Sequence, residues 1–108
     1  MTYKGHDIKY ELDGQLFVWN SVKSDINARK HNITFEEAAT VLIRTDTDIR
    51  EDNDNITGEE RYLALGFSKN LTMLLVCYCE RGENNEIIRI ISARKATIHE
   101  QKFYKGGL

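Results

Sequence analysis

Apolar and polar residues alternate along several short stretches of the chain, a pattern typical of half-buried β-strands. Two such stretches within residues 9–19 flank Asp13-Gly14, a dipeptide favoured in two-residue hairpin turns because both positions need positive φ. The strand pattern recurs three times further on, over residues 62–67, 72–80 and 87–93. The chain is therefore predicted to open with a β-hairpin and to form an antiparallel three-stranded meander later.

Two helices are predicted between the hairpin and the meander. Asn20 is suited to cap the first helix, which runs to about residue 31 and ends at Asn32, a residue that tolerates the left-handed conformation. Thr34 and Glu37 have the spacing of a capping box at the start of the second helix. The apolar side of this second helix consists of Phe35, Ala38, Ala39 and Leu42.

The remaining segments complete the predicted fold. Thr97 and Glu100 repeat the capping-box spacing and predict a short last helix through Tyr104. Residues 44–58 are polar and acidic without either period, so they are expected to form an exposed loop. Helices before and after an antiparallel sheet make the predicted fold class α+β. A chain of 108 residues can bury one modest core, so residues 1–108 are expected to be a single domain.

Charge is distributed unevenly, although the formal net charge is only −2. Residues 43–60 carry two basic and seven acidic side chains, whereas residues 61–108 carry eight basic and four acidic ones. The basic second half suits a phosphate backbone or an acidic partner, and ordinary solvated surface charge explains it as well. The acidic stretch and a pI near 5.9 fit poorly with a protein that simply coats nucleic acid.

The sequence carries neither a membrane segment nor a cofactor motif. No apolar run approaches the roughly 20 residues of a membrane-spanning helix, and the N-terminus has no apolar signal region. The protein is therefore expected in the cytoplasm, away from membranes. His6, His31 and His99 are scattered without metal-ligand spacing, and no glycine-rich phosphate loop is present. We expect no metal and no cofactor.

Lys30 and His31 stand at the end of the first predicted helix, where the helix dipole favours cations. A protonated imidazole there suits a proton donor or a phosphate contact. Neutralising the terminal carbonyls of the helix is the commoner role of such a pair. By itself, the pair is therefore only a candidate site.

Two arginines in the last meander strand interrupt its apolar pattern. Strict alternation places Arg89 and Arg94 on opposite faces of the sheet. A guanidinium on an apolar face needs a carboxylate, an exit to water or a bound phosphate. Arg89 is expected to pair with Glu59, Glu60 or Glu36. Arg94 lies at the exit of the strand towards the last helix and is expected to reach a ligand.

Glu59, Arg61 and Arg81 form a second candidate cluster. They stand at the start of one meander strand and at the end of its neighbour, so they are expected to converge at one edge of the sheet. A carboxylate, arginines and a nearby histidine suffice for metal-free RNA cleavage, which needs a base, an acid and cations for the phosphorane. A rim of exposed ion pairs is an equally good interpretation.

Core packing explains most of the aromatic residues. Trp19 and Tyr104 are retained as stacking surfaces for an RNA base. Lys23 and Lys95 are added to them as candidate RNA-binding residues.

Several motifs follow one another at a characteristic spacing from residue 17 to residue 104. They are Phe17-Val18-Trp19-Asn20, Lys23 and Asn27, Lys30-His31-Asn32-Ile33, Phe35-Glu36-Glu37-Ala38, Gly58-Glu59-Glu60-Arg61, Arg81-Gly82, the run IRIISARKAT over residues 88–97, Glu100 and Tyr104. Together they resemble the BrnT toxin family. Residues 1–16 lie outside the resemblance as an added N-terminal strand.

The resemblance implies the toxin of a bacterial type II toxin–antitoxin system, with a fold like that of the RelE and ParE toxins. It implies a metal-independent endoribonuclease that cleaves RNA and so inhibits translation and growth. It also implies a cognate antitoxin, BrnA-like and DNA-binding, which neutralises the toxin and through which alone operator DNA is bound.

On this basis the candidate catalytic residues are Lys30, His31, Glu59, Arg61, Arg81 and Arg94. His31 is assigned to proton transfer with Lys30 beside it, Glu59 is its possible partner, and the arginines bind phosphate. A non-catalytic alternative stays open. A toxin-like module that inhibits a protein target, or that represses its operon together with the antitoxin, would bind without breaking RNA.

Overall fold

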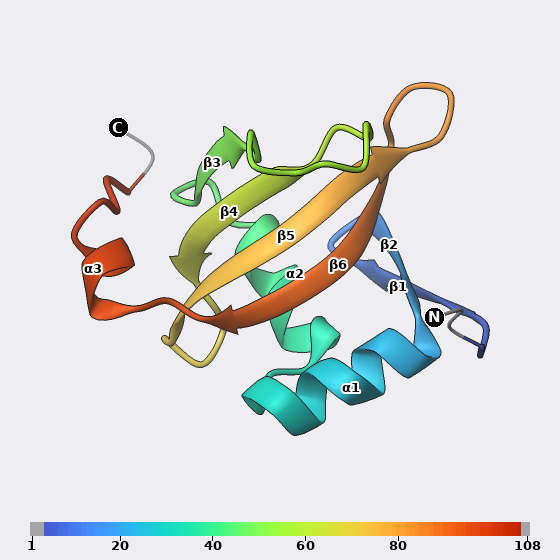
Figure 1. Ribbon diagram of the computed structural model, residues 1–108, viewed down its shortest axis with the longest axis horizontal. Helices are drawn as coiled ribbons and strands as arrows, with labels where there is room; N and C mark the ends of the chain where they lie inside the picture. The colour runs from blue at the N-terminus through green and yellow to red at the C-terminus, as the bar shows by residue number, and fades with distance from the viewer. Residues whose placement is uncertain (1–3, 107–108) are drawn as a thin grey trace.

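The computed structural model describes residues 4–106 of the chain. The strands within these residues are β1 (Asp7–Leu12), β2 (Gln15–Asn20), β3 (Asp48–Glu51), β4 (Tyr62–Phe67), β5 (Met73–Arg81) and β6 (Ile87–Lys95). The helices within them are α1 (Ser21–His31), α2 (Phe35–Leu42) and α3 (Ile98–Gln101). These strands form one mixed sheet in the order β1-β2-β6-β5-β4-β3 (Figure 1).

The predicted α+β class is confirmed, and the predicted meander is present as part of a larger sheet. β4, β5 and β6 pair antiparallel in turn. The N-terminal hairpin extends this meander, because β2 pairs in parallel with the first residues of β6. In the hairpin turn, Asp13 and Gly14 have φ values of 50° and 83°, as the sequence predicts.

The sequence pattern predicted a loop over the whole of residues 44–58, but part of this stretch is a strand. Residues 48–51 form β3, which pairs antiparallel with β4 and lies at one edge of the sheet. Its one apolar residue, Ile49, remains 53% exposed. A short edge strand that buries little needs no apolar alternation, so hydrophobic periodicity carries no signal for it. The prediction of a loop is wrong for this stretch.

The first two helices begin and end where their capping residues stand. The Asn20 side chain accepts hydrogen bonds from two backbone N–H groups of the first turn of α1, and Asn32 ends that helix with a φ of 58°. The Thr34 hydroxyl accepts from the backbone N–H of Glu37 at 3.1 Å. The Glu37 carboxylate accepts instead from the Ser68 hydroxyl at 2.7 Å, so α2 has half of the predicted capping box.

The last helix is shorter than predicted. Thr97 and Glu100 form the complete capping box that the sequence indicates. α3 nevertheless ends at Gln101, because the backbone N–H groups of Phe103 and Tyr104 bond to carbonyls three residues back, which is a tighter turn than an α-helix.

The core lies between α2 and one face of the sheet, and Figure 1 shows α2 behind the strands. Phe35 and Val41 of α2 are fully buried against residues such as Phe17 and Val76 of the sheet. The opposite face, which we call the open face, carries alternate residues of the meander strands. They include Leu63, Leu65, Leu75, Cys77 and Arg94.

A β-bulge in β6 decides which arginines reach the open face. The pairing with β5 shifts by one residue at Ile91, which is left without an opposite residue. Arg89 stands opposite Cys79 and Arg94 stands opposite Leu75, so both arginines lie on the open face. The prediction that they lie on opposite faces is wrong, because it assumed an unbroken strand.

Candidate active site

α1 lies along the edge of β6 beyond the point where β2 stops (Figure 1). The buried Asn27 side chain donates to the carbonyls of Ala93 (2.8 Å) and Ile33 (3.0 Å) and accepts from the Ala93 N–H (3.1 Å). These bonds replace those that a further strand would make to β6. They hold the last turn of α1, with Lys30 and His31, beside the open face.

A cavity of about 380 Å³ opens next to that last turn. Lys30 and His31 line it from α1, and Cys77, Ser92 and Arg94 line it from the strands. The structure therefore brings together three residues that the sequence predicts for the site. An anion in this cavity would face an imidazole, an ammonium and a guanidinium group.

A second group of predicted residues lies at the other end of the open face. Glu59 and Arg81 form an ion pair, and Arg61 lies near Glu59. The hydrogen bond from Arg81, assisted by the positive charge of Arg61, lowers the pKa of Glu59. Glu59 is therefore an ionised acceptor at neutral pH. The Nε of Arg61 is buried and has no hydrogen-bond partner within residues 4–106.

Lys23 connects these two groups of residues. Burial lowers its pKa first, and the positive charges of Arg61 and Arg89 lower it further. Arg89 of β6 and Arg61, which directly precedes β4, are thus both close enough to Lys23 to repel it. Such a cluster is stabilised by an anion that lies among them.

Arg89 forms its ion pair with a carboxylate that the sequence analysis did not consider. Asp7 of β1 lies 3.2 Å from the Arg89 guanidinium. The expected partners were Glu59, Glu60 and Glu36, and this expectation is wrong. The reason is topological, since the parallel pairing of β2 with β6 carries the hairpin to the Arg89 end of the strand.

Arg94 also has a partner, although it was expected to reach a ligand. It donates to both carboxylate oxygens of Glu100 at 2.8 Å, and the Thr97 N–H donates to the same carboxylate at 2.9 Å. The Arg94 side chain remains 39% exposed. It therefore still presents guanidinium surface to the cavity while Glu100 fixes its orientation.

The predicted RNA-binding residues do not come together. Trp19 is 1% exposed, with its ring centre 5.6 Å from that of Tyr10 and 5.8 Å from that of Phe35, so no base can stack on it. The Tyr104 hydroxyl donates to the carbonyl of Asp46 at 2.8 Å, and the half-buried ring packs edge-on with that of Phe67, with the ring centres 5.4 Å apart. This corrects the proposal that Trp19 is a stacking surface.

The two predicted lysines differ in their position. Lys23 belongs to the cluster on the open face. Lys95 is exposed and follows Arg94 directly, so strand alternation points it away from that face.

Sequence reasoning missed several residues that line the open face. Cys77 and Ser92 pair across β5 and β6 and line the cavity beside His31. Burial raises the pKa of Cys77, which keeps its thiol protonated. The signal that could have found Ser92 is its spacing of two from Arg94, because such residues share a strand face.

Residues 4–106 contain no group of three or more histidine, cysteine or acidic side chains arranged to hold a metal ion. No helix among them is long and apolar enough to cross a membrane.

The open face combines a histidine with cations from α1, β5, β6 and the residue before β4, and three of these cations are paired with carboxylates. It can hold an extended polyanion, stabilise negative charge that develops on a phosphate, and move a proton through His31. The fold and this face define a small α+β protein whose sheet carries cationic side chains on one face.

Comparison with known proteins identifies the family. The model for the ribonuclease toxin BrnT of type II toxin–antitoxin systems matches residues 19–100. This chain belongs to the BrnT family of ribonuclease toxins. The match starts at residue 19, so β1 and most of β2 lie outside it.

A solved structure supports the same fold. The 1.1 Å crystal structure of the Brucella abortus ribonuclease toxin BrnT is similar with a TM-score of 0.55 and 22% sequence identity. The similarity covers 73% of this chain and 92% of that chain. None of the curated protein sequences compared with this chain matches it.

Proposed function

We propose that this chain is a metal-independent endoribonuclease whose active site is the open face of the sheet. The observation that carries the proposal is the placement of Lys30, His31 and Arg94 around one cavity. The Glu59–Arg81 ion pair lies at the other end of the same face. Cleaved RNA would stop translation and growth, and the proposal places the protein in the cytoplasm with its substrate.

The proposed reaction is an internal transesterification of RNA. The 2′-hydroxyl loses its proton to a base, its oxygen forms a bond to phosphorus, and the bond from phosphorus to the 5′-oxygen breaks. The leaving 5′-oxygen takes up a proton, and the products carry a 2′,3′-cyclic phosphate and a 5′-hydroxyl. His31, with Lys30 beside it, is the residue assigned to proton transfer in this reaction. Arg94, beside His31, holds the charge of the phosphorane, and Arg61 and Arg81, at the other end of the face, bind another phosphate of the same RNA strand.

Glu59 acts in this proposal through Arg81. Its lowered pKa makes it a weak base, and its carboxylate is already bonded to the Arg81 guanidinium. It therefore orients Arg81 towards the phosphate, while the proton transfer is left to the imidazole.

The family implies a cognate antitoxin. We propose that this partner is BrnA-like and DNA-binding, that it covers the open face, and that operator DNA is bound only through the complex. Support comes from the apolar and cationic side chains that this face leaves accessible, since surfaces of this kind mark interaction sites.

The test is incubation of purified chain with a defined RNA in EDTA, beside His31→Ala and Arg29→Ala variants. Arg29 is exposed on α1 and does not line the cavity. We expect cleavage with 2′,3′-cyclic phosphate ends by wild type and Arg29→Ala, and its loss in His31→Ala. RNA that stays intact with wild type would favour the non-catalytic binding module. Cleavage only after a divalent metal is added would contradict metal independence.

A further inference from the structure

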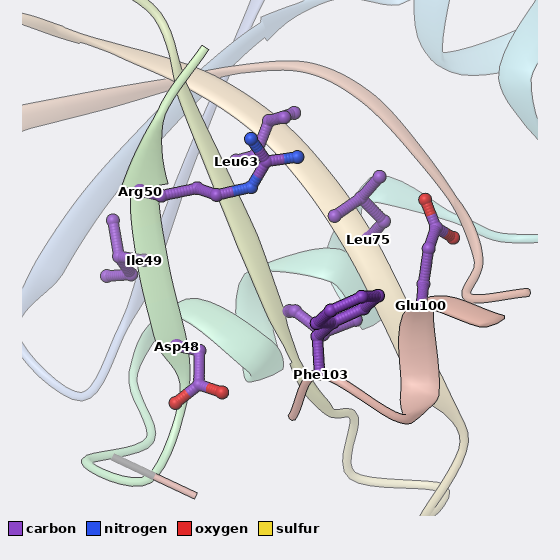
Figure 2. A pocket seen from close by; sticks show the side chains of 8 residues that line it. Asp48, Ile49, Arg50, Leu63, Leu75, Glu100 and Phe103 are labelled. Carbon is purple, nitrogen blue, oxygen red and sulfur yellow. The ribbon is translucent and has the colours of Figure 1, made fainter. Parts of the chain in front are cut away.

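A second cavity, of about 370 Å³, continues the open face towards the last helix. Leu63 and Leu75 line both this cavity and the one beside His31, so the two are adjoining parts of one groove. Figure 2 shows Arg50 reaching over this cavity from β3 while Phe103 points into it from the segment after α3. None of the assigned catalytic residues lines it.

The walls of this cavity have the chemistry that a nucleobase needs. Leu63, Leu65 and Leu75 form an apolar floor, and Phe103, which is 63% exposed, offers an aromatic face. Bases stack on aromatic side chains and on planar guanidinium groups such as that of Arg50. The carboxylate of Asp48 lies in the same wall, where one of its oxygens accepts from the backbone N–H of Lys105.

The charge of the cavity distinguishes it from its neighbour, which has nearly the same volume. Its volume is at the lower end of the range of about 300–1,000 Å³ found for small-molecule pockets, which suits one ring system better than a packed protein helix. Asp48 and Glu100 would repel a phosphate here, whereas Lys30 and Arg94 attract one next door. An RNA strand whose phosphate lies in the cationic cavity therefore has an apolar pocket beside that phosphate.

We propose that this cavity is a nucleobase subsite that holds a base adjoining the cleaved phosphate, stacked on Phe103. The inference rests on the proposed RNA cleavage. It assigns substrate positioning, and with it cleavage-site preference, to residues that take no part in the chemistry.

The experiment compares wild type with Phe103→Ala, Phe103→Trp and Ile98→Ala. Ile98 is 77% exposed and does not line the cavity, so its variant is the matched control. The probe is a 2′-O-methyl RNA oligonucleotide, which has no free 2′-hydroxyl to attack the phosphate, and its Kd is measured by fluorescence anisotropy. The same variants are then given cleavable RNA, and the positions of the cuts are mapped.

Phe103→Ala is expected to raise the Kd by about 5- to 100-fold, the usual effect of removing one stacked base contact. Phe103→Trp should bind close to wild type, Ile98→Ala should match wild type, and the cut positions should change only in Phe103→Ala. If Phe103→Ala leaves the Kd and the cut positions unchanged in a chain that cleaves RNA, the subsite is wrong while the ribonuclease stands.

The converse outcome is also informative. If wild type cleaves nothing, yet Phe103→Ala weakens oligonucleotide binding and Phe103→Trp binds close to wild type, base binding at Phe103 stands and the ribonuclease proposal falls.

Discussion

Glu100 ties the last helix to the open face through bonds to Arg94 and to the backbone of Thr97. These bonds, chiefly the one from Arg94, lower the pKa of Glu100 from 4.5 to about 2. A carboxyl group whose pKa is lowered by folding stabilises the protein above its unfolded pKa, and this stability is lost as pH falls through the folded value. The Glu100 contribution is thus complete at neutral pH and disappears between about pH 4.5 and about pH 2.

Glu100→Gln is expected to lower the free energy of unfolding at pH 7 by on the order of 1 kcal/mol, because the Arg94–Glu100 pair is partly exposed to solvent. For a chain of this size the Tm falls by about 4–8 °C. Thermal unfolding at pH 7 and at pH 2 measures the difference, which should shrink at the lower pH. Glu83→Gln, in an exposed turn, is the control. Equal Tm values for Glu100→Gln and wild type at pH 7 would contradict this account.

Single residues are predictable from sequence when their conformation is decided locally. The cap at Asn20, the left-handed Asn32 and the Asp13-Gly14 turn are all observed as predicted. The environment of Trp19 was not predictable in this way, because an indole ring serves equally in a core or on a binding surface. Only the packing of β2 against α2 decides between the two.

Among the elements, α1 depends on Asn27 for its place beside β6. Asn27→Ala would leave the N–H and the carbonyl of Ala93 buried without partners, which costs about 1–3 kcal/mol. Urea unfolding should show this loss, and hydrogen exchange should show faster exchange at the Ala93 amide. Asp25→Ala, exposed on the same helix, should change neither. Unchanged stability and unchanged Ala93 protection in Asn27→Ala would remove Asn27 from this role.

The elements that sequence reasoning missed share one physical cause. β3 is an edge strand that buries almost nothing, so no hydrophobic pattern marks it. The bulge at Ile91 is set by the pairing between β5 and β6, which is a non-local property. Because alternation was read as unbroken, Arg89 was separated from Arg94, although the two lie on one face.

For the whole molecule, the net charge of −2 hides a cationic open face. RNA binding there should weaken with salt, because each phosphate contact releases counterions with a log–log slope of about −0.7 on single strands. Lys23→Gln should make this slope shallower by about 0.7. Lys69 lies in a turn that contacts α2, away from the open face. Lys69→Gln should therefore leave the slope unchanged. Oligonucleotide titrations between low and high salt measure the slopes of wild type and of the two variants. An equal effect of Lys23→Gln and Lys69→Gln would contradict a specific binding face.

The candidate site as a whole was predictable only in part. Motif order indicated the family, and meander geometry indicated that Glu59 and Arg81 would meet, as their ion pair now shows. The joining of the hairpin to the meander, which gives Arg89 its partner Asp7, depends on a parallel pairing that no local pattern indicates. The roles assigned to these residues in catalysis stay predictions.

The most direct test of the account is the single-turnover cleavage rate of Arg81→Ala on a defined RNA in EDTA, compared with Arg29→Ala. Both side chains are exposed, so both variants should fold, and only Arg81 lies in the proposed site. Removing one charge-assisted contact to a phosphate costs about 1.5–3 kcal/mol, which is roughly 10- to 150-fold in rate. We predict a loss of this size for Arg81→Ala and none for Arg29→Ala. Unchanged cleavage by a folded Arg81→Ala would contradict the claim that the open face is the active site.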